Sequence, residues 1–292
     1  MPASSSSTGS APIRWSGGND LLRLYLQDIG RVDLLTAEDE VLLSRLVQQY
    51  ERLKREERHL AEDHPAIERL LCLEELQLRE ANHLSHWPTR QEWARAAEIP
   101  LQELNQAITK GYETWAGLID SDSRELQRRL REGRKARDRM IQANLRLVVA
   151  VAKKYQHRGM ELLDLVQEGT LGLERAVEKF DSTRGFRFST YSYWWIRQGI
   201  TRAIATQSRT IRLPVHITEK LNRIKRVQQE IASNEGRTAS MSDLARELSV
   251  SEDTVRQTLA RVPRSVSLET KVGRDQETQL GELLEDEHAT PE

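Results

Sequence analysis

The chain has 292 residues, of which 38 % are hydrophobic and 30 % are charged, and its formal net charge is −1. This length allows two or three small domains, and this composition suits a helix-rich protein with modest hydrophobic cores. Cys72 is the only cysteine, which excludes an internal disulfide and a metal site built from several cysteines. The sequence has no signal-peptide pattern and no apolar stretch of membrane-spanning length. We therefore expect a cytoplasmic protein.

Charge is distributed unevenly along the chain. Between residues 131 and 226, Lys and Arg outnumber Asp and Glu by roughly two to one, whereas the last residues are acidic. Binding to phosphates requires a local excess of positive charge and not a positive total. Only the central segment offers that excess.

The first half of the chain is expected to be helical after a short tail. Residues 1–18 are rich in Ser, Gly and Pro and are predicted to be disordered. A helix is predicted from Asp20 to Gly30, and a second one begins after Thr36, which is expected to cap it. Residues 54–135 have a charged helical pattern divided by three prolines. We find no chemistry in this segment and interpret it as a helical spacer or an interaction surface.

The second half divides into a larger and a smaller helical unit. Helices are predicted over residues 144–152, from about 162 to 177, and from about 189 to 207. The smaller unit, residues 214–262, is expected to hold helices over about 218–234, 242–248 and 251–262. The tail, residues 263–292, is predicted to be a partly extended linker. No strand is predicted, so the fold class is all-α, helical and multi-domain.

Aromatic side chains gather in one short segment of the chain. They make up 5 % of all residues, yet seven of them lie between residues 180 and 195, including all three phenylalanines. Arginines at 184, 187 and 197 are interleaved with them. A local hydrophobic core is the ordinary explanation for such a cluster.

The helix predicted over residues 189–207 argues against that explanation for part of the cluster, because it carries two different faces. Residues four and seven positions apart share a face of a helix. The apolar face, expected to lie against the core, carries Ile196, Ile200, Ala203 and Ile204. Another face carries Trp194, Gln198 and Thr201, with Trp195 and Arg202 beside it. A hydrophobic core does not require such a face.

Contact with DNA does require these residue types. Arginine neutralises phosphate, glutamine pairs with adenine, and a tryptophan ring stacks on a base. A stacked base gains about 1–3 kcal/mol, and extruding a base from the duplex costs a few kcal/mol. One or two stacking platforms therefore offset the opening of a base pair. This arrangement favours a protein that opens DNA over one that only binds the duplex.

Several segments, taken in order, resemble the primary-type bacterial sigma factors of the sigma-70 family. Segments 144–149, 164–169, 180–198 and 204–216 resemble the family's second region, segment 24–36 its short first region, and segment 267–282 its third-region finger. The short spacer is similar to that of cyanobacterial group two members. The resemblance implies a domain 2 at 19–213, made of region 1.2 at 19–53, the spacer at 54–135 and region 2 at 136–213. It implies a three-helix domain 3 at 214–262 and a finger and linker at 263–292.

The resemblance also implies roles in promoter recognition. The pocket for the flipped adenine of the minus-ten element corresponds to Phe180, Arg184 and Tyr191. The pocket for the last thymine corresponds to Asn144, Leu147, Arg187, Ser189 and Thr190. The wedge at the upstream edge of the bubble corresponds to Trp194 and Trp195, the readers of the first base pair to Gln198 and Thr201, and phosphate contacts to Arg202 and Arg212.

Further positions match contacts to other parts of the promoter and to the polymerase. His216 and Glu219 match contacts to the extended minus-ten motif, and Arg23, Tyr25 and Leu26 match contacts to the discriminator. The surface that grips the coiled coil of the largest polymerase subunit corresponds to Leu163, Asp164, Gln167 and Glu168, and the finger to Arg274, Asp275, Gln276 and Glu277. The implied partners are core RNA polymerase and promoter DNA, both double- and single-stranded. No cofactor, metal, membrane or small-molecule substrate is expected.

This chain departs from the family pattern at three places. Phe186 stands where a tyrosine is usual, which is a small change. Arg274 reduces the acidity of the finger, which puts its role in start-site priming in doubt. The helix-turn-helix domain for the minus-thirty-five element does not follow the finger. Either the sequence is a piece of a longer factor, or the factor works without that contact.

Two other functional classes stay open at this point. Residues 241–256 fit a helix-turn-helix pattern, so a stand-alone regulator could use Thr254 and Arg256 to contact bases. Such a regulator would bind duplex DNA without polymerase, and it leaves the aromatic cluster unexplained. An enzyme acting on nucleic acid is disfavoured, because the sequence has no glycine-rich phosphate loop and no His-Glu-x-x-His motif.

Overall fold

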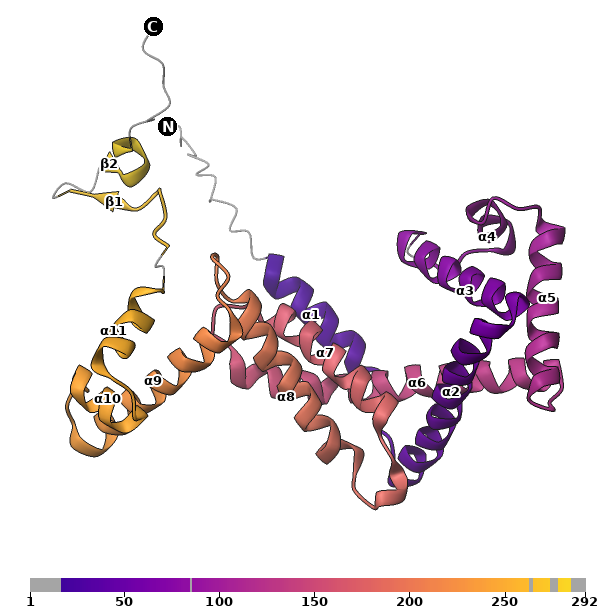
Figure 1. Ribbon diagram of the computed structural model, residues 1–292, viewed down its shortest axis with the longest axis horizontal. Coiled ribbons are helices and arrows are strands. Elements are labelled where there is room, and N and C mark those ends of the chain that lie inside the picture. Colours follow the sequence, from indigo (N-terminus) through magenta and orange to yellow (C-terminus); the bar gives the residue numbers. More distant parts are fainter. Residues whose placement is uncertain (1–16, 85, 263–264, 274–277, 285–292) are drawn as a thin grey trace, which may run out of the picture. The chain divides into compact units, whose positions relative to one another are not determined.

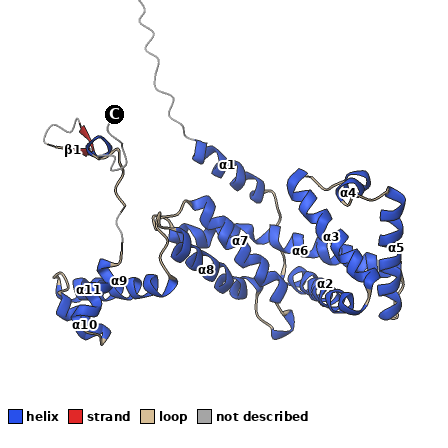
Figure 2. Ribbon diagram, turned by 45° about the horizontal axis from the view of Figure 1, so that its top comes forward, coloured by secondary structure: helices blue, strands red, loops and turns tan. Residues whose placement is uncertain are grey.

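The computed structural model describes residues 17–84, 86–262, 265–273 and 278–284. Within these ranges it contains eleven α-helices and one small antiparallel pair of strands, β1 (Lys271–Val272) and β2 (Thr278–Gln279), in which Lys271 lies opposite Gln279 (Figure 2). The all-α fold class is confirmed. The two-residue strands escape a sequence pattern because they are too short to show alternation. The predicted finger residues 274–277 lie outside the described residues.

Contacts divide the described chain into two compact units. Unit 1 comprises residues 17–156 and 162–200, and unit 2 comprises residues 157–161 and 201–284. The border therefore falls within a helix, between Ile200 and Thr201, whereas the family resemblance suggested a border at 213. The two glycines at 17 and 18, assigned to the tail, belong to the first helix instead.

Unit 1 begins with helices whose ends follow local sequence signals. Helix α1 is Gly17–Gly30 and α2 is Ala37–Asp63 (Figure 1). The predicted cap is confirmed, because the Thr36 hydroxyl accepts a hydrogen bond from the Asp39 N–H (3.1 Å) and the Asp39 carboxylate accepts one from the Thr36 N–H (3.0 Å). These bonds lower the pKa of Asp39.

The spacer is built around its prolines, as predicted. Helix α3 (Pro65–Leu84) begins on a proline, and α4 (Arg90–Ala96) is capped by Thr89 just after Pro88. Helix α5 (Leu101–Leu118) follows Pro100. These helices pack against α2 and against the first half of α6 (Ser123–Ala152).

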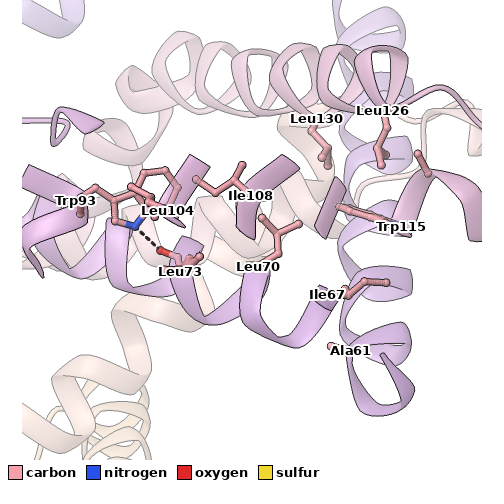
Figure 3. Close-up of a cluster of buried hydrophobic side chains, with 12 residues drawn as sticks. Ala61, Ile67, Leu70, Leu73, Trp93, Leu104, Ile108, Trp115, Leu126 and Leu130 are labelled. Carbon is pink, nitrogen blue, oxygen red and sulfur yellow. Dashed lines mark hydrogen bonds between the residues drawn. The ribbon is translucent and has the colours of Figure 1, made fainter. Parts of the chain in front are cut away.

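The spacer helices enclose a hydrophobic core of their own (Figure 3). Trp115 is fully buried there, and Trp93 is nearly so. The indole Nε1 of Trp93 donates a hydrogen bond to the Leu73 carbonyl (2.9 Å), which satisfies its polar atom inside the core. The spacer is therefore a packed helical subdomain attached to α2 and α6 and not a solvated charged rod.

The remaining helices of unit 1 approach each other closely. They are α7 (Leu162–Lys179) and α8 (Phe188–Gln207). Only the last residues of α8, from Thr201 on, belong to unit 2. A Cβ added at Gly172 would lie 2.5 Å from the Trp195 carbonyl oxygen. Only glycine permits this contact, and it holds the aromatic part of α8 directly against α7.

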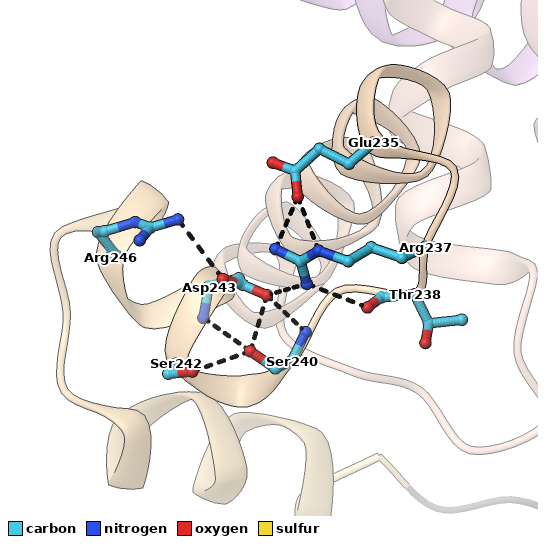
Figure 4. A network of polar contacts seen from close by, with 7 residues as sticks. All are labelled: Glu235, Arg237, Thr238, Ser240, Ser242, Asp243 and Arg246. Carbon is cyan, nitrogen blue, oxygen red and sulfur yellow. Dashed lines mark hydrogen bonds and ion pairs between the residues drawn. The ribbon is translucent and has the colours of Figure 1, made fainter.

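Unit 2 holds a three-helix bundle made of α9 (Val215–Glu235), α10 (Met241–Leu248) and α11 (Glu252–Ala260). Its small core contains Ile224, Leu244, Ala245 and Val255. A polar network fastens the start of α10 (Figure 4): the Asp243 carboxylate accepts hydrogen bonds from the Ser240 N–H (3.0 Å) and from Arg237 (2.6 Å). These partners hold the pKa of Asp243 well below its usual range. The predicted three-helix composition of this unit is confirmed.

Candidate nucleic-acid interface

Helix α8 has the two faces that its sequence predicts. Ile196 and Ile200 are fully buried, and Ala203 is 3 % exposed. The opposite face is open, with Trp194 62 % exposed and Gln198 also exposed. The core explanation is therefore confirmed for Ile196, Ile200 and Ala203, whereas Ile204 is only half-buried; for the tryptophan face it is wrong.

The aromatic cluster is divided between a buried floor and accessible rings. Phe180 and Phe188 are buried and meet edge to face, with ring centroids 5.1 Å apart. Tyr191 lies on this floor, 5.7 Å from Phe180, and 6.4 Å from the ring of Trp195 on its other side. Both Tyr191 and Trp195 are half-buried. A half-buried ring is held in one orientation while part of it stays open for stacking.

Cations lie over two of the accessible rings. The Lys179 Nζ lies 4.7 Å from the centroid of the Trp195 ring, and the Arg197 guanidinium lies 5.5 Å from that of Trp194. Each cation stabilises its ring and adds positive charge where a phosphate would pass. Sequence reasoning missed Lys179, although it stands directly before Phe180.

A buried carboxylate fixes the start of α8. Glu40 is 8 % exposed, and its two oxygens accept hydrogen bonds from Arg187 (3.0 and 3.2 Å). The same carboxylate accepts the Phe188 N–H (3.2 Å), which is otherwise without a partner at a helix N-terminus. This pairing raises the pKa of Arg187. The sequence marked Glu40 only as part of an acidic first turn, so its partnership with Arg187 was missed.

The loop between α7 and α8 presents further polar groups. Asp181 accepts hydrogen bonds from the Thr183 N–H (2.9 Å) and hydroxyl (2.6 Å) and lies 3.5 Å from the Arg184 guanidinium. Gly185, with φ of 74°, ends this turn in the left-handed conformation. Arg184, Ser189 and Thr190 are all exposed. Arg184 in the loop and Ser189 and Thr190 in the first turn of α8 are therefore all accessible.

The other predicted residues of the thymine pocket lie on α6. The Asn144 side-chain amide donates to the Met140 carbonyl (2.8 Å), and Leu147 is half-buried. Among the described residues, no hydrogen bond joins Asn144 to Arg187, Ser189 or Thr190. The structure thus places this set on α6, on α8 and on the residue before α8, where Arg187 is bound by Glu40.

Helix α1 supplies the predicted discriminator residues. Arg23 is exposed, and Tyr25 and Leu26 are half-buried. Burial raises the pKa of the Tyr25 hydroxyl, and a hydrogen bond with Thr170 partly offsets this rise. Tyr25 therefore anchors α1 beside α7 and leaves Arg23 free to meet a ligand.

Helix α7 carries the predicted polymerase surface. Asp164 and Gln167 are exposed, while Leu163 and Glu168 are half-buried. Leu171 is 52 % exposed, and it lies seven residues after Asp164 on the same helix face. An exposed leucine flanked by polar groups is typical of a protein-binding surface. Sequence reasoning did not include Leu171.

Unit 2 contains a basic cavity of about 810 Å³. Thr201 lines it together with four cations that sequence reasoning did not single out: Arg158, Arg209, Lys225 and Arg226. The loop beside it depends on Gly159, whose φ is 89° and whose Cα faces the Ser208 carbonyl so closely that a Cβ would lie 2.7 Å from it. The only signal of this cavity in the sequence was the excess of Lys and Arg over Asp and Glu between residues 131 and 226.

The predicted residues near the start of α9 are accessible. His216 and Glu219 are exposed in its first turns, and Arg202 is exposed on α8. Arg212 is also exposed, and it donates a hydrogen bond to the Thr206 carbonyl (3.3 Å). No group of three or more potential metal ligands occurs in the part of the chain that the structure describes. In that same part, every helix is too short or too polar to cross a membrane.

Three parts of the chain match descriptions of one protein family. Three family descriptions match: Sigma-70 factor, region 1.2, over residues 20–53, Sigma-70 region 2 over 140–210, and Sigma-70 region 3 over 219–292. The central match contains the whole aromatic cluster and the exposed face of α7. The spacer, residues 54–135, lies outside all three.

Several cyanobacterial RNA polymerase sigma factors are similar to this chain. The chain is 56 % identical to the RNA polymerase sigma-C factor of Nostoc, over 94 % of this chain and 66 % of that protein. It is 53 % identical to the probable RNA polymerase sigma-C factor of Synechocystis, over 94 % and 68 %. With the sigma factor SigA2 of Synechococcus elongatus the identity is 47 %, over 93 % and 72 %. The chain thus spans about two thirds of the length of these relatives, and it belongs to the sigma-70 family of RNA polymerase sigma factors.

Proposed function

We propose that this chain acts as an RNA polymerase sigma factor: it binds core polymerase, recognises the minus-ten promoter element and promotes its melting. The observation that carries this proposal is the set of accessible aromatic rings on α8. Tyr191 packs on the buried Phe180, Trp195 packs against Tyr191, Trp194 is exposed, and cations lie over both tryptophans. Such platforms bind unpaired bases and cannot stack on bases that remain paired in the duplex.

Melting then follows because the chain binds unpaired bases more tightly than paired ones. In the proposed mechanism, one extruded adenine stacks in a pocket floored by Phe180 and bounded by Tyr191 and Arg184. Trp194 and Trp195 stand at the upstream edge of the DNA bubble, where their rings replace the stacking that the last paired base loses. The last thymine is bound near the start of α8, by a set comprising Asn144, Leu147, Arg187, Ser189 and Thr190. Each stacked base contributes about 1–3 kcal/mol, enough to offset the extrusion of that base.

Duplex DNA upstream is proposed to meet the polar residues beyond this cluster. Gln198 and Thr201 contact the first base pair, and Arg202 and Arg212 contact phosphates. His216 and Glu219 contact the extended motif. The four cations of the unit 2 cavity add backbone contacts of the same kind, which support the proposal without conferring sequence specificity.

The partner surface is proposed to be the exposed side of α7. Asp164, Gln167 and the half-buried Leu163 and Glu168 contact the coiled coil of the largest polymerase subunit, with the exposed Leu171 beside them. Arg23, Tyr25 and Leu26 contact the discriminator, and the finger residues 274–277 enter the active cleft. The chain supplies binding only, and the polymerase supplies the chemistry. The factor therefore acts in the cytoplasm, on the nucleoid.

A stand-alone helix-turn-helix regulator is the other candidate. Its base-reading residues would lie on α11, where Arg256 is exposed but the Thr254 hydroxyl already lies 2.7 Å from that of Ser251. Helix α11 has only nine residues. This candidate gives no role to the exposed tryptophan face of α8, so we favour the sigma function.

The deciding experiment measures binding of a single-stranded minus-ten oligonucleotide by the chain mixed with core polymerase. We expect binding that needs the polymerase and falls when the flipped adenine is replaced by another base. Tyr191→Phe, which keeps the ring, serves as the matched control for Tyr191→Ala. Tight binding to duplex DNA without polymerase, indifferent to that adenine, would instead identify a helix-turn-helix regulator.

A further inference from the structure

The spacer contains a cleft that the proposed function does not use. It has a volume of about 590 Å³ and lies between residues of α2, α3, α4, α5 and α6 and the segment before α4. A second hollow of about 470 Å³ shares Lys54, Glu74, Trp87 and Arg134 with it. Small-molecule sites in proteins have volumes of roughly 300–1,000 Å³. The cleft is therefore large enough for a ligand.

Three arginines give the cleft its charge. Arg90, Arg131 and Arg134 all line it, and each is exposed. None of the three forms an ion pair with a carboxylate within the described ranges. Arg90 and Arg134 lie over the rings of Trp93 and Trp87, at 5.2 and 5.4 Å from the ring centroids. Guanidinium groups without carboxylate partners bind phosphate strongly, because their fork matches its geometry.

The one carboxylate in the wall of this cleft is already neutralised. The two oxygens of Glu74 accept hydrogen bonds from Lys54 (2.6 Å) and from the Tyr112 hydroxyl (2.6 Å). Lys54 also donates to Glu57, which is fully buried and whose second oxygen has no partner among the described residues. Burial and the nearby Glu74 charge raise the pKa of Glu57. Lys54 offsets one of the two carboxylate charges, and the three arginines outnumber the other, so the cleft stays positive.

The remaining wall suits a planar ring with polar edges. Trp87 is 52 % exposed and stands beside the arginines. Gln77, Asn105, Thr109 and Gln127 also line the cleft, and none of these side chains is hydrogen-bonded to another described residue. Amide groups pair with the edges of bases, and an indole stacks on their faces. Phosphate-binding and base-binding groups thus occur together.

We propose that this cleft binds a nucleotide, with its phosphates on Arg90, Arg131 and Arg134 and its base against Trp87. An acidic peptide would use the arginines but would leave the exposed indole and the four neutral polar side chains without a role. The site lies in the segment that none of the sigma-70 regions covers. The proposal concerns ligand binding by the spacer and is independent of promoter melting.

The test is isothermal titration calorimetry on the full chain, with ADP and GDP as probes and with pyrophosphate and adenosine as their halves. We expect saturable binding of at least one nucleotide at concentrations below about 1 mM. Arg131→Ala with Arg134→Ala should weaken it about tenfold or more, since the double variant removes two of the three guanidinium groups that contact the phosphates. Trp87→Ala should weaken nucleotide binding and leave pyrophosphate binding unchanged.

The control is Lys135→Ala, which removes an exposed cation of the same helix that does not line the cleft. Circular dichroism would verify that every variant is folded, and the minus-ten oligonucleotide assay should be unaffected by the arginine variants. Three results would overturn the proposal: no saturable binding, equal affinity in the double arginine variant, or loss of binding on Trp194→Ala instead. Equal competition by a polyglutamate peptide would also overturn it, in favour of a peptide site.

Discussion

Two regions of this protein combine tryptophan, tyrosine and arginine, and they use them in opposite ways. In the spacer, Trp115 is fully buried and Trp93 is 4 % exposed, so these rings form a core. On α8, Trp194 is 62 % exposed and lies under a cation. The residue types are the same, but the buried Trp115 and Trp93 are closed to bases, whereas the exposed Trp194 is open to them. Tryptophans beside arginines therefore indicate base binding only where the rings stay exposed, as Trp194 does and as Trp115 and Trp93 do not.

The largest expected effect lies in the spacer core. Trp115→Ala should lower the free energy of unfolding by about 3–5 kcal/mol, because it removes a fully buried ring and leaves a cavity. Trp194→Ala, its counterpart on the exposed face, should change that free energy by less than about 0.5 kcal/mol. Urea denaturation of both variants measures the difference. Equal destabilisation would mean that the two regions are both cores, and the comparison would fail.

The next effect concerns DNA opening. Tyr191→Ala should spare polymerase binding and weaken binding of the single-stranded minus-ten element by about 1–3 kcal/mol, roughly 5- to 150-fold. Tyr191→Phe should retain most of the affinity, because the ring carries the stacking. Fluorescence anisotropy of a labelled oligonucleotide with reconstituted holoenzyme measures both. If polymerase binding fell as much as DNA binding, the stacking role would be refuted.

The buried ionic network of the spacer predicts a pH effect of intermediate size. The pKa of Glu57 is raised above its ordinary value of 4.5, so ionisation of this group opposes folding. That penalty is absent below about pH 4.5 and grows as the pH rises towards the folded-state pKa. Glu57→Gln should therefore be more stable than wild type at pH 7 and equal to it near pH 4. In a chain of this size, each kcal/mol of added stability raises Tm by about 2–4 °C.

Thermal melts of wild type and Glu57→Gln between pH 4 and 8 measure this difference. Lys54→Met removes the shared ammonium and is the matched opposite, since it leaves two carboxylates unpaired and should destabilise most at high pH. A wild type that is more stable than Glu57→Gln at pH 7 would show that the ionised carboxylate strengthens the spacer.

The smallest effect tests the cation over Trp195. Lys179→Ala should weaken binding of the minus-ten oligonucleotide two- to fivefold, since exposed cation–π pairs contribute about 0.5–1 kcal/mol. Lys179→Arg should restore the affinity, because a guanidinium also lies well over an indole ring. The anisotropy assay used for Tyr191 serves here too. An unchanged affinity in Lys179→Ala would show that the cation does not contribute to DNA binding and that packing alone orients the Trp195 ring.

The sequence by itself determined the local features of this protein. The three prolines and the caps Thr36 and Thr89 mark where the first helices begin, because these signals act within one turn of the chain. The spacing along α8 separates its buried isoleucines from its exposed tryptophan, since helix periodicity is a local property. The resemblance to the sigma-70 family depended on several short segments that follow one another in the family's order, and the family comparisons confirm it.

Only the tertiary structure decided which distant residues meet. Glu40 binds Arg187 across 147 residues of chain, and Lys54 pairs with Glu74 from another helix. The same holds for the spacer core, where Trp115 and Trp93 are buried although the sequence shows only a charged helical pattern in that segment. Local spacing cannot encode such contacts, because they depend on how helices pack and not on the period of any one of them. The basic cavity of unit 2 and the arginine cleft of the spacer are products of that packing.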